Sequence, residues 1–141
     1  IMASVLKVNT LTGVTTAGSI VVTGEGNSTT TNLQQGLAKS WLSMNGAGTI
    51  AVRDSFNITS ISDGGVGLTD VTIANNMSDG AYSLTGASGT WIANSNNVRL
   101  GFSTETHPPT TTLFRTITRG ANDNTDRDVT YSFAQVFGDL A

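Results

Sequence analysis

A hairpin pattern between residues 53 and 79 constrains the fold of this chain more than any other feature. Phe56 and Ile58 alternate with polar neighbours, and this period of two places apolar side chains on one face of a β-strand. The glycine-rich segment 62–65 then interrupts the alternation with residues that adopt the positive φ values of a tight turn. The partner strand is expected at residues 71–73, so the pattern predicts antiparallel β-structure.

Short strands separated by turn residues recur along the rest of the chain. Two of them carry apolar side chains on a single face: Val98, Leu100 and Phe102 in one, and Val129, Tyr131 and Phe133 in the other. With almost no helical pattern, the chain is predicted to be all-β, an antiparallel β-sandwich of jelly-roll type. The further strands are predicted at residues 38–44, 49–52, 81–85, 90–93, 98–102, 113–119 and 129–137.

Composition excludes several classes of function. The net charge is -3, so the chain has no basic patch to neutralise phosphates, and neither nucleic acid nor an anionic membrane is an expected partner. Without cysteine there is no disulfide, no thiolate zinc site and no cysteine nucleophile. No apolar run approaches the ~18 residues of a membrane-spanning helix, so membrane insertion is not expected either.

Residues 1–35 differ from the predicted domain at residues 36–141. Short strands at 4–8 and 19–23 stand among threonine- and glycine-rich stretches that leave little apolar area to bury. We expect this segment to gain order by pairing with other chains, as an attachment or oligomerisation arm; the alternative is a tail without fixed structure. Asn32, followed three residues later by Gln35, is predicted to cap a helix of one or two turns.

Three segments of the predicted domain form a specific succession. Gly-Leu-Ala-Lys-Ser-Trp at residues 36–41 precedes an Asn-Gly pair at residues 45–46. Arg-Asp-Ser-Phe-Asn-Ile-Thr-Ser-Ile at residues 53–61 leads through the glycine-rich turn to a partner ending in Asn-Asn-Met-Ser-Asp, and Val-Phe-Gly-Asp-Leu-Ala ends the chain. Together they resemble the β-domains of phage tail fibres and related virion appendage proteins, especially those of marine bacteriophages. The leading segment 6–10 resembles their short N-terminal arms.

The resemblance implies a homotrimer of β-sandwich heads on the virion exterior. Such a head contacts a glycan or protein of the host surface, while residues 1–35 bind other virion proteins. The chain lacks the long shaft of a typical fibre. Two alternatives therefore stay open: a capsid or tail decoration protein without a receptor role, and a small carbohydrate-binding or hydrolytic module. The first reading predicts a protein that is not an enzyme and uses no cofactor.

Two loops are the expected places for receptor contact, because binding residues concentrate on loops held by a rigid scaffold. One loop covers residues 104–110 and the other residues 121–128. The candidate contact residues are Glu105, Thr106, His107, Asn122, Asp123, Asn124 and Asp126.

Neither loop is expected to hold a metal or a catalytic group. His107 is the only histidine, which leaves a catalytic triad without local support, and no His-x-His pattern is present. The acidic stretch 122–128 is superficially similar to a calcium loop. However, Arg127 stands where an EF-hand needs glycine, and Phe133 where it needs a bidentate glutamate. A polar hairpin turn is the expected structure.

Trp41 and Trp91 are candidates for stacking against sugar rings. Burial in the sandwich or between subunits is the competing interpretation, because the chain has only 6% aromatic residues to build a core. Trp91 and Ile92 are adjacent and point to opposite faces of a strand. If both are buried, a second surface must cover that strand, as a trimer interface would.

Overall fold

The computed structural model describes residues 5–14, 20–24, 29–89 and 98–141, which form parts of two compact units, Ile1–Leu37 and Ala38–Ala141. In the first unit, β1 (Val21–Thr23) pairs antiparallel with β2 (Thr30–Asn32) and is followed by the short helix α1 (Leu33–Gly36). The Asn32 side chain accepts hydrogen bonds from the backbone N–H groups of Gln34 and Gln35, at 2.8 and 3.3 Å. The predicted helix cap is therefore confirmed.

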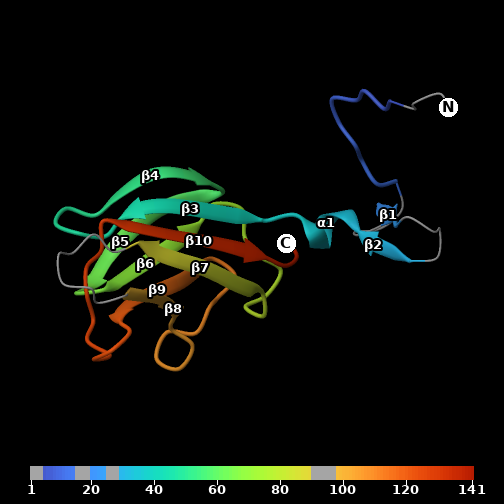
Figure 1. The fold of residues 1–141 in the computed structure, drawn as a ribbon. Coiled ribbons are helices and arrows are strands. Elements are labelled where there is room, and N and C mark those ends of the chain that lie inside the picture. Colours follow the sequence, from blue (N-terminus) through green and yellow to red (C-terminus); the bar gives the residue numbers. More distant parts are fainter. Residues whose placement is uncertain (1–4, 15–19, 25–28, 90–97) are drawn as a thin grey trace. The chain divides into compact units, whose positions relative to one another are not determined.

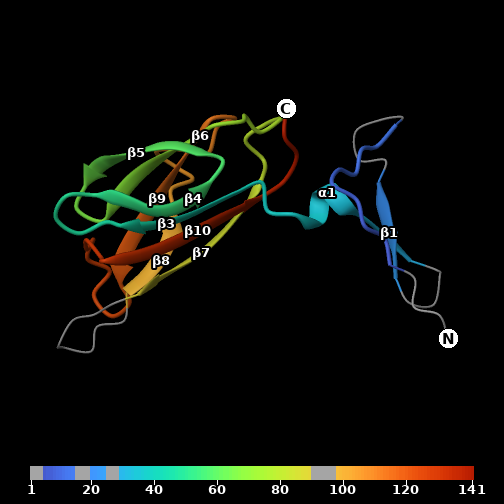
Figure 2. The ribbon, with the colours of Figure 1, turned by 90° about the horizontal axis from the view of Figure 1, so that it is seen from above.

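The second unit is built from two four-stranded antiparallel sheets, which Figures 1 and 2 show as two layers. The first sheet has the strand order β4-β3-β10-β7, and the second has the order β5-β6-β9-β8. This arrangement confirms the predicted all-β class and is consistent with a β-sandwich. The strands are β3 (Ser40–Asn45), β4 (Ala51–Phe56), β5 (Ile58–Gly65), β6 (Leu68–Ile73), β7 (Ser83–Gly89), β8 (Val98–Phe102), β9 (Leu113–Gly120) and β10 (Tyr131–Phe137).

The core lies between the two sheets and follows the alternation of the sequence. Ser40, Leu42 and Met44 of β3 are all buried, as their shared parity predicts. The other sheet supplies Val71 and Phe114, among others. The buried hydrophobic cluster consists of Leu42, Met44, Val71, Ile73, Met77, Phe114, Ala134 and Val136.

The predicted single strand at residues 53–61 is wrong, because the chain changes sheets at Asn57. This residue has a φ of 57°, in the left-handed region that asparagine tolerates better than most side chains. Its Nδ2 donates to the carbonyls of Lys39 and Asn75, at 2.9 and 3.2 Å, and its Oδ1 accepts from the Asn75 N–H at 2.6 Å. These bonds fix a corner that places β4 in the first sheet and β5 in the second.

The hairpin of β5 and β6 has the predicted partners, but its turn lies further along. Ile61 pairs with Val71, whereas the predicted turn 62–65 is still strand. The reversal occurs at residues 66–67, where Gly67 has a φ of +70°. A Cβ on Gly67 would lie 2.6 Å from the Thr118 carbonyl oxygen, so only glycine fits there.

Strand β10 turns the predicted apolar face of Tyr131 and Phe133 outward. Both side chains are 45% exposed, while Ser132, Ala134 and Val136 face the core. Val129, expected on the same face, precedes the strand and is buried. The small residues of the alternation fill the narrow space between the sheets, and the aromatic ones lie outside it. The predicted strand 90–93, with Trp91 and Ile92, lies outside the described residues.

The two ends of the sandwich differ in what they hold. At one end, here called the entry end, β3 begins opposite the end of β10, with Ser40 paired to Val136. Met77 forms a β-bridge with Leu140 at the same end. At the other end, here called the far end, Gly46 donates to the Val129 carbonyl and the Thr118 N–H donates to the Gly67 carbonyl. The chain therefore enters and leaves the sandwich at the same end.

Candidate functional site

The outer face of the second sheet carries three arginines, here called the arginine face: Arg99, Arg115 and Arg119. Along β9, Phe114, Thr116 and Thr118 are buried, so the residues between them point away from the core. The strand register places Arg99 of β8 directly opposite Arg119 of β9. It likewise pairs Asp70 of β6 with Arg115. Both predicted contact loops reach this face.

The loop 104–110 meets the arginine face at Arg115. The guanidinium binds Asp70 through two hydrogen bonds of 2.7 Å, from Nε and Nη2, and its Nη1 donates to Nδ1 of His107 at 3.1 Å. The hydrogen bond from Arg115 is the main reason why the pKa of Asp70 is lowered, and the same bond raises the pKa of Arg115. Thr106 Oγ1 lies 3.2 Å from His107 Nδ1, and Glu105 is exposed.

The loop 121–128 meets the arginine face at its other end. Asp126 accepts from Nε of Arg119 at 2.5 Å, and Asn124 accepts from Arg99 through its side-chain oxygen. Asp123 forms an ion pair with Arg127. The hydrogen bond from the Thr125 N–H, and after it that from Arg127, lowers the pKa of Asp123. Asn122 is exposed. The predicted hairpin is wrong, because β9 and β10 belong to different sheets and this polar loop crosses from one sheet to the other. Its side chains are tied to the second sheet by arginines.

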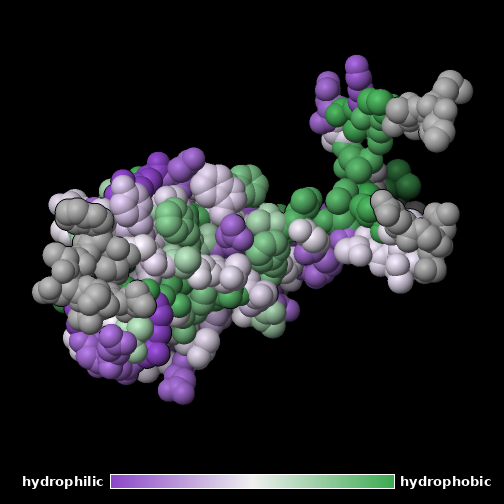
Figure 3. Space-filling model, in the orientation of Figure 1, coloured by the Kyte–Doolittle hydropathy of each residue, from purple (hydrophilic) through white to green (hydrophobic). Residues whose placement is uncertain are grey.

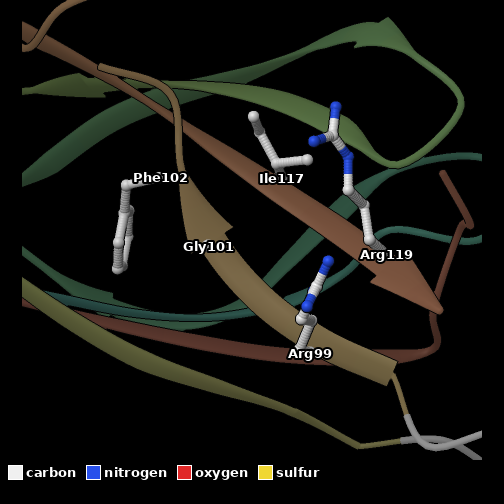
Figure 4. A pocket seen from close by; sticks show the side chains of 5 residues that line it. All are labelled: Arg99, Gly101, Phe102, Ile117 and Arg119. Atoms are coloured by element: carbon white, nitrogen blue, oxygen red, sulfur yellow. The ribbon is translucent and has the colours of Figure 1, made fainter. Parts of the chain in front are cut away.

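A pocket of about 140 Å³ lies between these contacts, on the outer side of β8 and β9. Figure 4 shows Arg99, Ile117 and Arg119 on one side of β8, with Phe102 on its other side. Gly101 pairs with Ile117, and together they form an uncharged floor beside the two guanidinium groups. The pocket lies toward the far end of the sandwich, next to loop 121–128.

The structure places the two predicted loops at opposite ends of β9 and so does not join them into one site. Loop 104–110 lies at the entry end, where the Tyr82 hydroxyl donates to the Thr110 carbonyl. Loop 121–128 lies at the far end. The sequence interpretation missed the arginine face, although Arg115, Ile117 and Arg119 already recur with a period of two in the strand it predicted.

The first sheet has a different outer surface, here called the aromatic face: Trp41, Phe56, Tyr131 and Phe133. Trp41 is half-buried and lies opposite Phe56 in the register of β3 and β4. The rings of Tyr131 and Phe133 are nearly parallel, with centroids 6.5 Å apart. The Arg53 guanidinium lies over Tyr131, 4.3 Å from the ring centroid. Hydrophobic and near-neutral atoms cover much of β3 and β10 in Figure 3.

The described residues do not gather the groups of a metal centre. None of their clusters contains three or more histidine, cysteine or acidic side chains. Burial raises the pKa of Tyr82 to about 12, and its hydroxyl donates a hydrogen bond to the Thr110 carbonyl in the loop at the entry end. Within the described part of the chain, no helix is long and apolar enough to cross a membrane.

No protein-family model, curated protein or solved structure matches the chain.

Proposed function

We propose that this protein is a structural protein of a bacteriophage virion, a homotrimeric tail-fibre or appendage head on the virion exterior that contacts the host surface. Two lines support the proposal: the resemblance of segments within residues 36–141 to phage appendage domains, and the sandwich of two antiparallel sheets. The single observation that carries it is the aromatic face. Phe56 is 54% exposed there, and Tyr131 and Phe133 are 45% exposed.

A second copy of this chain is the occupant that best suits the aromatic face. A saccharide stacks on the flat face of an aromatic ring, but one face of Tyr131 is already covered by Arg53. Phe133 stands parallel to Tyr131, with the two ring centroids 6.5 Å apart, so the other face of Tyr131 is turned toward a protein side chain as well. Close-packed side chains of another subunit cover such a surface more fully. The number three comes from the family resemblance.

The first unit supports the predicted attachment role of the arm. Its described residues keep large apolar side chains in water: Val14 is 94% exposed and Leu6 is 77% exposed. Figure 3 shows hydrophobic atoms over much of this unit. Contiguous apolar surface of this kind marks interaction sites in soluble proteins. In the proposal, the arm binds other virion proteins or its own copies, and the loops 104–110 and 121–128 of the sandwich contact the host.

Light scattering coupled to size-exclusion chromatography tests the assembly. The full chain is expected to elute as a trimer at micromolar concentration, and Phe133→Ser is expected to shift it to the monomer. Val66→Ser is the matched control, because Val66 is also an exposed apolar residue but lies in the β5–β6 turn. A stable wild-type monomer, or a Phe133→Ser protein that stays trimeric, contradicts the proposed interface.

Binding to host cells separates the receptor role from the decoration role. A labelled trimer is expected to bind cells directly through avidity, since three weak contacts act together. A protein that binds purified particles and ignores cells would instead be a decoration protein.

A further inference from the structure

The pocket on the arginine face holds two positive groups that the fold brings together. Arg99 and Arg119 are directly opposite each other on neighbouring strands, a position in which like charges destabilise a sheet. Both line the same pocket of about 140 Å³. The arrangement needs a negative group to offset the repulsion.

The neighbouring loop supplies only part of that negative charge. Asp126 forms an ion pair with Arg119. Arg99 instead donates a hydrogen bond to the side-chain oxygen of Asn124, which carries no charge. Asp123, the other acid that the loop turns toward an arginine, is paired with Arg127. Among the described residues, no carboxylate forms a salt bridge with Arg99, and residues 90–97 contain no acid in their sequence. The pocket therefore has one positive charge more than its protein partners balance.

The form of the pocket selects among anions. A planar guanidinium matches a planar carboxylate through two parallel hydrogen bonds. The floor of Gly101 and Ile117 offers apolar contact to the carbon skeleton that carries the carboxylate. At about 140 Å³ the pocket is smaller than the ~300–1,000 Å³ typical of sites that bury a drug-sized ligand, so it admits one small unit.

We propose that this pocket binds the carboxylate of a single acidic sugar unit, with Arg99 as the principal partner and the sugar ring against Ile117. The unit is either free in solution or part of a host surface polysaccharide. The second source rests on the proposed function, because it makes the acidic sugar the receptor. The pocket lies on the second sheet, so it stays separate from the aromatic face.

Nuclear magnetic resonance of the full-length, nitrogen-15-labelled protein tests the ligand class. Titration with sodium glucuronate is expected to shift the side-chain Nε–H signals of Arg99 and Arg119 saturably. Glucose, which has the same ring without the carboxylate, is expected to leave them unchanged at equal concentration. Shifts no larger than those caused by sodium chloride at the same ionic strength would overturn the proposal, as would equal shifts at Arg53.

Two variants locate the binding, and a third is the control. Arg99→Gln removes the charge, and Gly101→Leu fills the pocket while keeping both arginines. A Cβ on Gly101 has only the Ile117 carbonyl oxygen near it, at 3.9 Å, so the fold accommodates this change. Each variant is expected to weaken glucuronate binding at least about tenfold, since a hydrogen-bonded charge is lost or excluded. Arg53→Gln, on the first sheet, is expected to bind as the wild type does.

A competition experiment between glucuronate and host cells distinguishes the source of the sugar and keeps the two proposals separable. Glucuronate binding together with cell attachment that excess glucuronate abolishes supports a polysaccharide receptor. Glucuronate binding without such competition supports the free sugar as the ligand. A trimer that binds cells but not glucuronate would refute the pocket alone. A monomer that binds glucuronate would refute the assembly alone.

Discussion

At the scale of single residues, Asn57 forms the corner at which the continuous segment 51–65 passes from the first sheet to the second. Its left-handed backbone and its three side-chain hydrogen bonds are both needed to hold the corner. We predict that Asn57→Ala lowers the free energy of unfolding by about 2–4 kcal/mol, because it combines backbone strain of ~1–2 kcal/mol with the loss of these bonds. Urea unfolding followed by tryptophan fluorescence measures the change.

A second substitution at the same position separates the two causes. Asn57→Gly removes the hydrogen bonds but permits the positive φ, so it is expected to destabilise the protein less than Asn57→Ala. Equal losses for the two variants would show that the backbone conformation contributes nothing. The sequence could not predict this corner, since Phe56 and Ile58 continue the period of two straight through it.

At the scale of elements, the ion pair of Asp70 and Arg115 joins β6 to β9 across the outer face of the second sheet. Folding lowers the pKa of Asp70 below its ordinary value of 3.8. The pair therefore adds stability above about pH 4, and this contribution is lost as the pH falls through the lowered pKa of the folded state. We predict that Asp70→Asn costs about 1–2 kcal/mol at pH 7 and progressively less as the pH falls below about 4. Unfolding in urea, an uncharged denaturant, at a series of pH values measures the difference.

The pair of Asp126 with Arg119 provides the comparison for this prediction. Its side chains are 35% and 39% exposed, against 20% and 14% for Asp70 and Arg115. Water screens the more exposed pair more strongly, so Asp126→Asn is expected to change stability less at pH 7. A larger loss from Asp126→Asn would contradict the ranking by burial.

The elements also show which part of the fold could be predicted. Strands β3 and β9 were located well because buried residues alternate with more exposed ones along each of them. The pocket could not be located in this way. It needs Arg99 to lie opposite Arg119, and that pairing depends on the register of two strands joined by a loop of ten residues. The turn at Gly67 likewise depends on residues that are far from it in the sequence, namely Thr118 and Arg127.

At the scale of the whole molecule, the hydrophobic core formed by the described residues lies in the second unit. Every member of the buried cluster lies between Leu42 and Val136. We predict that a chain of residues 38–141 folds cooperatively, with a melting temperature within about 5 °C of the full-length protein, because it keeps every member of this buried cluster. Differential scanning calorimetry measures this. Failure to fold, or a much lower melting temperature, would mean that the arm stabilises the sandwich itself.

The pairing of β3 with β10 also determines how the second unit resists force. Both strands have their outer chain ends at the entry end, so a pull between residues 38 and 141 would peel the ladder open one bond at a time. When residue 38 is pulled while the far end of the sandwich is held, the force instead acts along the length of β3. The hydrogen bonds to β4 and β10 are then sheared together, because they run perpendicular to the strand. The sandwich therefore resists a pull between its point of entry and its far loops better than a pull between residues 38 and 141.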